Sequence, residues 1–221
     1  MLAGEAVVAI WNGITDAGRA EFYAWHLHEH MPERVGIPGF RRGRRYAAAD
    51  GATHPGYFTL YEADTMQVLQ GSDYLNRLNA PTAWTRTATA AFQDTSRALA
   101  RVVASEGPGM GGVALTIRFD ADLAAAPALA ALVSATAASA RVAGAHLCAA
   151  DPASSGATTA ESKGRTDIRP PPAWFAMVEA TDAAALADLL PVDALREAGA
   201  QGELTRGLYR LEYIRTKTTS T

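Results

Sequence analysis

The chain has 221 residues, enough for one large domain or two small ones, since domains commonly hold about 100–150 residues. Hydrophobic residues make up 48% of the chain and charged residues 19%, which is the composition of an ordinary globular protein. A formal net charge of -3 gives no electrostatic reason to expect nucleic acid or an acidic membrane as a partner. These values favour a partner that is recognised locally, such as a small-molecule substrate.

The cysteine content and the opening residues indicate a cytoplasmic protein. The single cysteine, Cys148, cannot form an internal disulfide bond. The sequence does not open with the basic and apolar stretches of a secretory leader. The longest uncharged stretch, 123–140, is mostly alanine and contains Pro127, so it predicts a soluble helix and no membrane span.

In chain order, the first half predicts alternating strands and helices. Strands are expected at 6–11, 40–49, 57–63 and 95–105, where β-branched and aromatic residues gather. A helix capped by Thr15 or Asp16 is expected over 16–34, and a second over 65–79. Residues 80–92 predict a short additional helix before the last strand.

The second half predicts the same elements in the same order. Strands are expected at 112–119, 144–150, 174–180 and 204–215, with helices from Asp120 or Asp122 to about 140 and over 182–199. The segment 57–63 (YFTLYEA) matches 174–180 (WFAMVEA), and each is followed by an acidic helix start. A loop rich in Ser, Gly and Pro at 152–172 is expected to be mobile.

This repeated order predicts an α+β protein built from two tandem ferredoxin-like (β-α-β-β-α-β) units. Their boundaries are expected at 1–108 and 109–216, with a flexible tail at 217–221. A four-stranded sheet with both helices on one face leaves its other face bare. We therefore expect the two antiparallel sheets to pack into one pseudo-symmetric α/β barrel.

The first helix holds three of the five histidines of the protein. At about 100° per residue, Ala20, Ala24, Leu27 and Met31 fall on one stripe, which we interpret as the buried face.

Three polar residues, Tyr23, His30 and Arg34, flank this stripe and could point into a gap between helix and sheet. Phe22 and Trp25 are expected on the far side, where they suggest a homodimer contact through an aromatic face.

His30 is the best candidate for chemistry, because a histidine at the border of a core can accept or donate a proton near neutral pH. The alternative is a histidine that only donates to a backbone carbonyl. His26 and His30 stand at i, i+4 spacing, which can hold a metal, but no third ligand is evident. We therefore predict no metal.

The second and third strands supply further candidates. Alternation places Phe40, Arg42, Arg44 and Tyr46 on one face of the second strand, and Arg41 and Arg45 on the other. Most of these arginines are expected to be solvated edge charges, while one inward arginine such as Arg44 could hold an anionic group.

Tyr57 and Tyr61 share a face of the third strand, where they either pack in the core or supply a phenol to a cavity. Asn79 and Trp84 are expected at its rim, with packing the alternative for Trp84.

The sequence resembles the dimeric α/β-barrel superfamily and, within it, the group related to the EthD protein of ether degradation. The resemblance rests on Trp25 followed by 29–34 (EHMPER), on 37–46 (IPGFRRGRRY), and on 57–62 (YFTLYE). It covers about the first 105 residues well and the second half in outline. It implies that the helix histidine of the family is His30, with Pro32 and Arg34 after it. Such barrels serve as muconolactone isomerases, cofactor-free monooxygenases, polyketide cyclases, dehydratases and haem enzymes, so the fold does not choose the reaction.

These observations lead to one favoured function and two alternatives. We expect a cofactor-independent isomerase, dehydratase or cyclase in which His30 shuttles a proton and Arg34, Tyr46 or Tyr61 steadies an oxyanion. The expected substrate-binding residues are Tyr23, His26, Arg44, Asn79 and Trp84. The alternatives are a cofactor-free monooxygenase and a non-catalytic binding or assembly protein. A cavity reached by His30 would favour an enzyme, and a solid core with His30 bonded to backbone would favour the last alternative.

Overall fold

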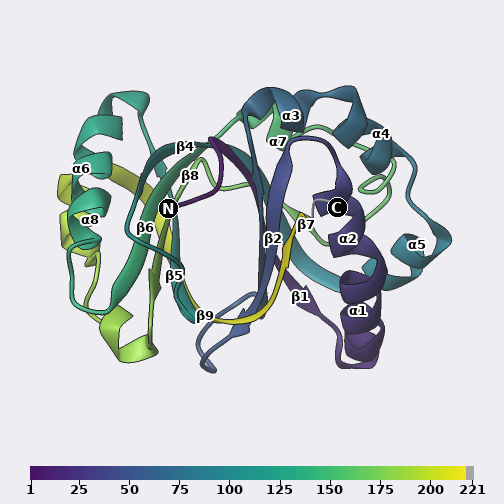
Figure 1. Ribbon diagram of the computed structural model, residues 1–221, viewed down its shortest axis with the longest axis horizontal. Helices are drawn as coiled ribbons and strands as arrows, with labels where there is room; N and C mark the ends of the chain where they lie inside the picture. The colour runs from purple at the N-terminus through teal and green to yellow at the C-terminus, as the bar shows by residue number, and fades with distance from the viewer. Residues whose placement is uncertain (218–221) are drawn as a thin grey trace.

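Eight antiparallel strands close into a barrel in the computed structural model, which describes residues 1–217 (Figure 1). In barrel order the strands are β1 (Ala6–Ile14), β3 (Tyr57–Ala63), β2 (Phe40–Ala48), β9 (Ala200–Thr216), β5 (Val113–Ala121), β8 (Trp174–Ala180), β6 (Val142–Ala150) and β4 (Phe92–Glu106). Pairing of β4 with β1 closes the ring. A two-residue strand, β7 (Ile168–Arg169), pairs parallel to β4 outside the barrel. The expected α+β class with an antiparallel barrel is confirmed.

Two long strands make the sheet continuous. The first part of β4 pairs with β1 and its second part with β6, whereas β9 pairs first with β5 and then with β2. The strands of the two halves are thus joined edge to edge, and every strand of the ring has two neighbours. This closure leaves no exposed edge in the ring.

The inside of the barrel is packed with side chains. Alternate residues of each strand point inward, and aromatic rings fill much of the interior. The Trp11 ring stacks on Phe58 at 5.1 Å between centroids and meets Phe175 edge-on at 5.2 Å. Tyr209 packs on Phe58 from the other side of the barrel.

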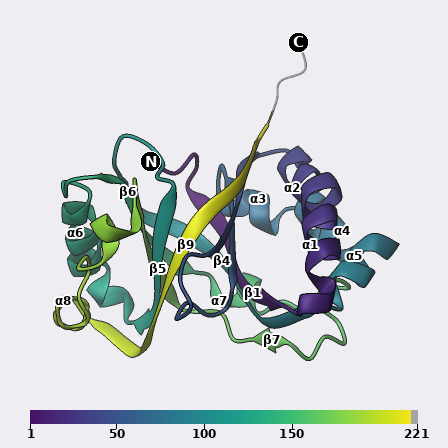
Figure 2. The same cartoon turned by 90° about the horizontal axis from the view of Figure 1, so that it is seen from below.

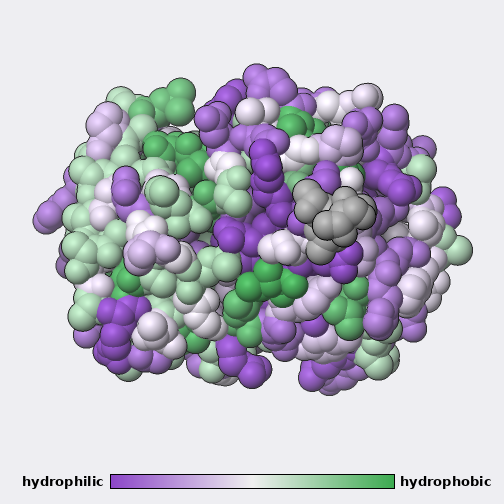
Figure 3. Space-filling model, viewed as in Figure 1, coloured by the Kyte–Doolittle hydropathy of each residue, from purple (hydrophilic) through white to green (hydrophobic). Residues whose placement is uncertain are grey.

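The helices lie outside the barrel in two groups on opposite sides (Figures 1 and 2). One group holds α1 (Arg19–Trp25), α2 (Met31–Gly36), α3 (Met66–Gln70), α4 (Ser72–Asn79) and α5 (Ala83–Thr89). The other holds α6 (Ala126–Thr136) and α8 (Val192–Glu197). A short helix, α7 (Pro152–Ser155), begins the long loop of the second half. Figure 3 shows hydrophilic residues over the first group and mostly weakly hydrophobic residues over the second.

Several expected elements differ in detail from the structure. The helix expected over 16–34 contains a π-helical turn at His26–His30 between α1 and α2. The helix expected over 182–199 is reduced to a 3-10 turn (Ala183–Leu186) and α8. The expected additional helix is α5. Most of the tail expected at 217–221 lies outside the described residues.

The loop at 156–173 crosses from the second half to the first. Figure 2 shows the segment around β7 passing along β1 and β4 on the side of α1 and α5. The Glu161 amide donates to the Leu78 carbonyl at 3.0 Å, and the Thr95 amide donates to the Asp167 carbonyl at 2.8 Å. The stretch that its composition predicts to be mobile is therefore bonded to the first half along its length.

No helix of the described residues has the length and apolarity to cross a membrane.

Candidate functional site

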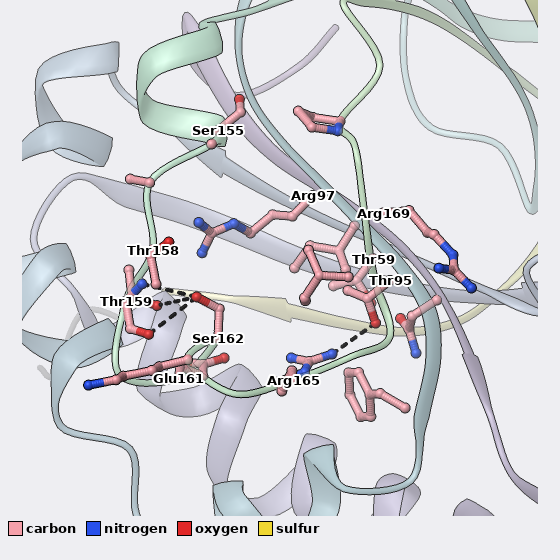
Figure 4. A pocket seen from close by; sticks show the side chains of 18 of the residues that line it. Thr59, Thr95, Arg97, Ser155, Thr158, Thr159, Glu161, Ser162, Arg165 and Arg169 are labelled. Carbon is pink, nitrogen blue, oxygen red and sulfur yellow. Dashed lines mark hydrogen bonds between the residues drawn. The ribbon is translucent and has the colours of Figure 1, made fainter.

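A cavity of about 560 Å³ lies between the first group of helices and the barrel. Strands β1, β3 and β4 form its floor, α1 and the π turn form one wall, and the loop 155–171 forms its roof. The close view in Figure 4 shows this loop passing in front of the strands that form the floor.

The strand register places three floor residues in one row. Ile10 of β1 lies opposite Thr59 of β3 on one side and opposite Arg97 of β4 on the other. All three line the cavity, because alternate residues of these strands point out of the barrel toward the helices. Asn12 and Thr95 add a polar margin to the same floor.

The π turn carries both buried histidines. A π turn holds an extra residue compared with an α-helical turn, so it rotates the residues that follow it relative to those before it. His26 and His30 both line the cavity and are 3% and 6% exposed, with their ring centroids 5.5 Å apart. The His30 ring lies against Trp25 at 4.2 Å. The Trp25 indole is itself fixed, since it donates to Glu29 at 3.1 Å and to Thr85 at 3.2 Å.

Neither histidine is held in place by a hydrogen bond at Nδ1. Within residues 1–217, the buried Nδ1 atoms of His26 and His30 have no partner. Burial lowers the pKa of His26 to about 3, helped by the charges of Arg45 and Arg34. Burial likewise holds the pKa of His30 well below 6.5, with Arg34 and His26 as further causes. Both rings are therefore neutral near pH 7 and can accept a proton.

The position of His30 distinguishes between the two roles considered for it, proton transfer and packing. A packed histidine would donate to a backbone carbonyl, whereas His30 faces a cavity and makes no such bond to any described residue. This geometry favours a chemical or binding role over simple packing.

An ion pair holds the roof to the helices. Glu161 of the loop pairs with Arg34 of α2, with Nη2 and Oε2 2.5 Å apart, and Arg34 also pairs with Glu33 at 3.1 Å. Burial alone would lower the pKa of Arg34, but Glu161 and its other anionic or phenolic neighbours raise it. The Ala160 amide donates to the Asn79 side chain at 3.0 Å beside this pair. Arg34 and Asn79 were both expected in the site. Instead, they hold the roof loop in place and do not line the cavity.

A second fixed point of the roof lies at Arg165. Its guanidinium pairs with Asp167 at 2.6 Å, donates to Thr95 Oγ1 at 2.9 Å and lies over the Phe92 ring at 5.1 Å. The dashed line in Figure 4 marks the bond to Thr95.

The structure places the expected tyrosines on opposite faces of the sheet. Tyr61 points toward the helices, with its ring 6.1 Å from His30, and its buried hydroxyl has no partner among the described residues. Burial raises its pKa, so the phenol stays protonated. Tyr46 points into the barrel, where it contacts Arg44 at 2.9 Å and Glu179 at 3.3 Å. Tyr46 and Arg44 are therefore separated from His30 by the sheet.

The remaining expected residues also lie outside the cavity lining. Tyr23 donates to Glu212 at 3.0 Å and lies under the Arg45 guanidinium at 4.5 Å. Trp84 is half-buried and donates to Glu21.

Three expectations from the sequence are wrong. The stripe containing Ala20 and Leu27 is not the buried face, since Phe22 and Trp25 are each 1% exposed. The aromatic face proposed as a homodimer contact is therefore inside the chain. The second error concerns Phe40: a bulge between Phe40 and Arg42 turns it to the helix side, opposite Arg44 and Tyr46.

The third error concerns the arginines of the second strand, most of which were expected to be solvated edge charges. Arg44 and Arg45 are buried, and Arg42 is partly buried, because each pairs with a glutamate of a neighbouring strand.

Sequence reasoning missed the polar residues of the floor and roof. Thr59 alternates with Tyr57 and Tyr61 and could have been placed on their face. Arg97 and Thr95 lie in a strand whose neighbours are set by long-range pairing, and Lys163 and Arg165 lie in a loop with no periodic pattern. No local signal identifies these residues.

Comparison with known proteins places the chain by its fold. No family model and no curated protein matches the sequence. Among solved structures, an anthrone oxidase-like protein has a TM-score of 0.62 and 11% identity, covering 96% of this chain and 92% of that one. A "putative monooxygenase" from Lactobacillus acidophilus NCFM has a TM-score of 0.56 and 10% identity, covering 96% of each chain. A mutant chlorite dismutase from Candidatus Nitrospira defluvii has a TM-score of 0.52 and 11% identity, covering 95% of this chain and 92% of that one.

The similarity to these structures confirms the expected α/β barrel at the level of fold. They do not show the EthD-related group. At such low identities a shared fold does not determine a shared reaction.

Proposed function

We propose that the protein is a small-molecule enzyme that removes a proton from an acidic carbon or phenol, with His30 as the general base. One observation carries the proposal: two buried, neutral histidines without Nδ1 partners among the described residues line a cavity of about 560 Å³. The volume lies in the range of small-molecule sites, which is about 300–1,000 Å³. No cofactor enters the proposed step.

The lowered pKa of His30 restricts the substrate class. A base with a low pKa is available at neutral pH but has little driving force, so it suits substrates whose conjugate anions are themselves stabilised. Enolisable ketones and phenols meet this condition because the charge is delocalised onto oxygen. The anion formed beside His30 also offsets the unfavourable burial of the imidazolium. Proton return to a different carbon would complete an isomerisation. Proton transfer to a leaving hydroxyl group, which departs as water, would complete a dehydration. Attack of the carbanion on a carbonyl of the same substrate, with the proton passed to that carbonyl oxygen, would complete a cyclisation.

A second candidate, a cofactor-free monooxygenase, follows from the same step. Delocalised carbanions are electron-rich and can react directly with dioxygen. For an anthrone the balanced reaction consumes one dioxygen, converts the methylene to a carbonyl and releases one water. The fold shared with an anthrone oxidase-like protein makes anthrone a rational probe for both candidates.

We also infer that residues 1–108 and 109–216 are copies of one ferredoxin-like unit. The support is a matching register: Glu62 lies opposite Val7 between β3 and β1, and Glu179 lies opposite Ala114 between β8 and β5. The helix of the second copy, α6, has no charged residue and no histidine. The proposed chemistry therefore belongs to the first copy, with one site per chain.

Exchange of the anthrone methylene protons in heavy water, followed by NMR without oxygen, tests the proposed base. The wild type should accelerate exchange, and His30→Asn should reduce that acceleration by about 100-fold or more, the usual contribution of a positioned base. His28→Asn is the matched control, because His28 is exposed on the same helix. Equal acceleration by wild type and His30→Asn, or none by either, would contradict the proposal.

The same samples in air distinguish the two candidates. Oxygen uptake matched by anthraquinone formation would favour the monooxygenase, whereas exchange without oxygen uptake favours acid/base chemistry alone. An absorption spectrum with a Soret band would show a bound haem and contradict a cofactor-free reaction.

A further inference from the structure

We propose that Arg97 makes this cavity a receptor for an anionic substrate, namely an aryl carboxylate whose acidic proton end faces His30. The orientation of the substrate rests on the proposed function, whereas recognition of the anion does not.

The charge balance of the cavity is the first support. Four cationic side chains line it: Arg97, Lys163, Arg165 and Arg169. Arg165 pairs with Asp167 at 2.6 Å, and Arg169 pairs with Asp94 at 2.6 Å.

The other two cations have no compensating charge. Within residues 1–217, no carboxylate forms a salt bridge with Arg97 or Lys163. Glu161, an acidic lining residue, is engaged by Arg34. With both histidines neutral, the cavity carries an uncompensated positive charge.

The position of Arg97 is the second support. Arg97 belongs to the barrel floor and is partly buried, and the neutral phenol of Tyr74 contacts it. Figure 4 shows its side chain extending across the cavity toward Thr158 of the roof. A guanidinium is more weakly hydrated than an ammonium and offers paired N–H donors that fit a carboxylate. A carboxylate here would form charge-assisted hydrogen bonds with it.

The spacing of the strands in the cavity floor sets the distance between the histidine side of the cavity and its Arg97 side. Thr59 and Arg97 flank Ile10 across three neighbouring strands, so their backbones are about 10 Å apart. The His30 ring lies 6.1 Å from Tyr61 of β3, on the Thr59 side of Ile10, whereas Arg97 of β4 lies on the other side. Phe92 and Trp25 also line the cavity. An aromatic ring over Ile10 would thus place a proton donor toward the histidines and a carboxylate toward Arg97.

Binding of two matched probes tests the anion site. Naphthol supplies the aromatic ring and the phenol, and a hydroxynaphthoate adds one carboxylate on the far ring. For the wild type, the carboxylate should tighten binding by about 10- to 100-fold, the range for a hydrogen bond to a charged group. Calorimetric titration measures both affinities at one ionic strength.

Variants of Arg97 test whether this residue causes the tighter binding of the carboxylate probe. Arg97→Gln should abolish the carboxylate advantage while leaving naphthol affinity unchanged, and Arg97→Lys should retain part of it. Arg101→Gln is the control, because Arg101 is exposed on the same strand and outside the cavity lining. An equal affinity of the wild type for both probes, or no binding of the hydroxynaphthoate, overturns the proposal. An advantage that survives in Arg97→Gln overturns the role of Arg97.

A third probe keeps the test independent of variant folding. A naphthol carrying an ammonium group in place of the carboxylate should bind the wild type more weakly than naphthol, and tighter binding would overturn an anionic preference. His30→Asn separates this inference from the proposed function. It should keep the carboxylate advantage even where it loses proton exchange, so each idea can fail alone.

Discussion

Breaking the ion pair between Arg34 and Glu161 should release the roof of the cavity. Both side chains are largely buried, with 4% and 16% of their areas exposed. Removing one partner of a buried ion pair typically destabilises by about 3–5 kcal/mol. Arg34 keeps Glu33 as a second partner, so we expect Glu161→Gln to lower the free energy of local opening by about 2 kcal/mol. That corresponds to an open population about 30-fold larger.

Limited trypsin digestion measures this opening, because Lys163 and Arg165 lie in the same loop. At low protease concentration the cleavage rate follows the population of the open form. We expect cleavage near these residues to be about 30-fold faster in Glu161→Gln, with Glu5→Gln as an exposed acid-to-amide control.

A double-mutant cycle with Arg34→Met then isolates the pair. A coupling energy above about 1 kcal/mol is expected for residues in direct contact. Unchanged cleavage in Glu161→Gln, or purely additive effects in the cycle, would refute the role of this ion pair in holding the roof.

Four further predictions concern the pH response and the buried polar groups. Because burial holds the pKa of His30 well below 6.5, the base stays neutral as pH falls, and anthrone exchange should continue undiminished through pH 6.5. A midpoint at the ordinary histidine value would contradict this reasoning. Tyr61→Phe removes a buried hydroxyl without a partner in the described part of the chain, so the free energy of unfolding should be unchanged or raised by up to about 1 kcal/mol. Tyr46→Phe, which loses its bonds to Arg44 and Glu179, should lower the free energy of unfolding in the same denaturant titration. Burial would raise the pKa of Glu179, but Arg44 and His146 outweigh it and lower the pKa to about 2. The stabilisation is therefore present above the unfolded value of 4.5 and lost as pH falls toward 2. The stability difference between wild type and Glu179→Gln should shrink by about 3 kcal/mol over that range, and a constant difference would argue against the pairing.

The strands and their order along the chain could be predicted from the sequence, because the residue patterns that indicate a strand are local. β-branched and aromatic residues mark each strand, and the similar patterns at 57–63 and 174–180 predict the strands β3 and β8. Closure of the ring through the long strands β4 and β9 was harder to predict from the sequence. It depends on pairings between residues far apart in the chain, such as Val102 with Cys148 and Arg44 with Ile214.

The face of the first helix could not be predicted because a regular period of 3.6 residues was assumed. The π turn at 26–30 changes the phase within the helix, which brings His26 to the buried side along with His30. The close approach of this helix to β2 also requires Gly43, where a Cβ would lie 2.1 Å from the Met31 sulfur. The sequence indicated His30 correctly as a core-border residue but assigned its aromatic neighbours to the wrong side.

The polar cluster inside the barrel explains why the cavity lies outside it. Arg44 bridges the carboxylates of Glu62 and Glu179 at 2.9 and 2.6 Å, and His146 contacts Glu179 at 3.2 Å. These groups contact one another within the interior, and aromatic rings fill much of its remaining space. Arg42 pairs with Glu62 at 2.6 Å and supplies the second positive charge, so the two carboxylates are compensated.

On the outer face, the two halves of the barrel use their helices differently. Leu129 and Val133 of α6 are fully buried and fill the space against the barrel. Beneath α1 and the π turn, the corresponding layer contains His26, His30 and a cavity closed by a loop from the other half. The second half thus supplies the roof of this cavity and the first half supplies the histidines. The proposed site therefore takes residues from both halves, although all of the proposed proton chemistry resides in the first.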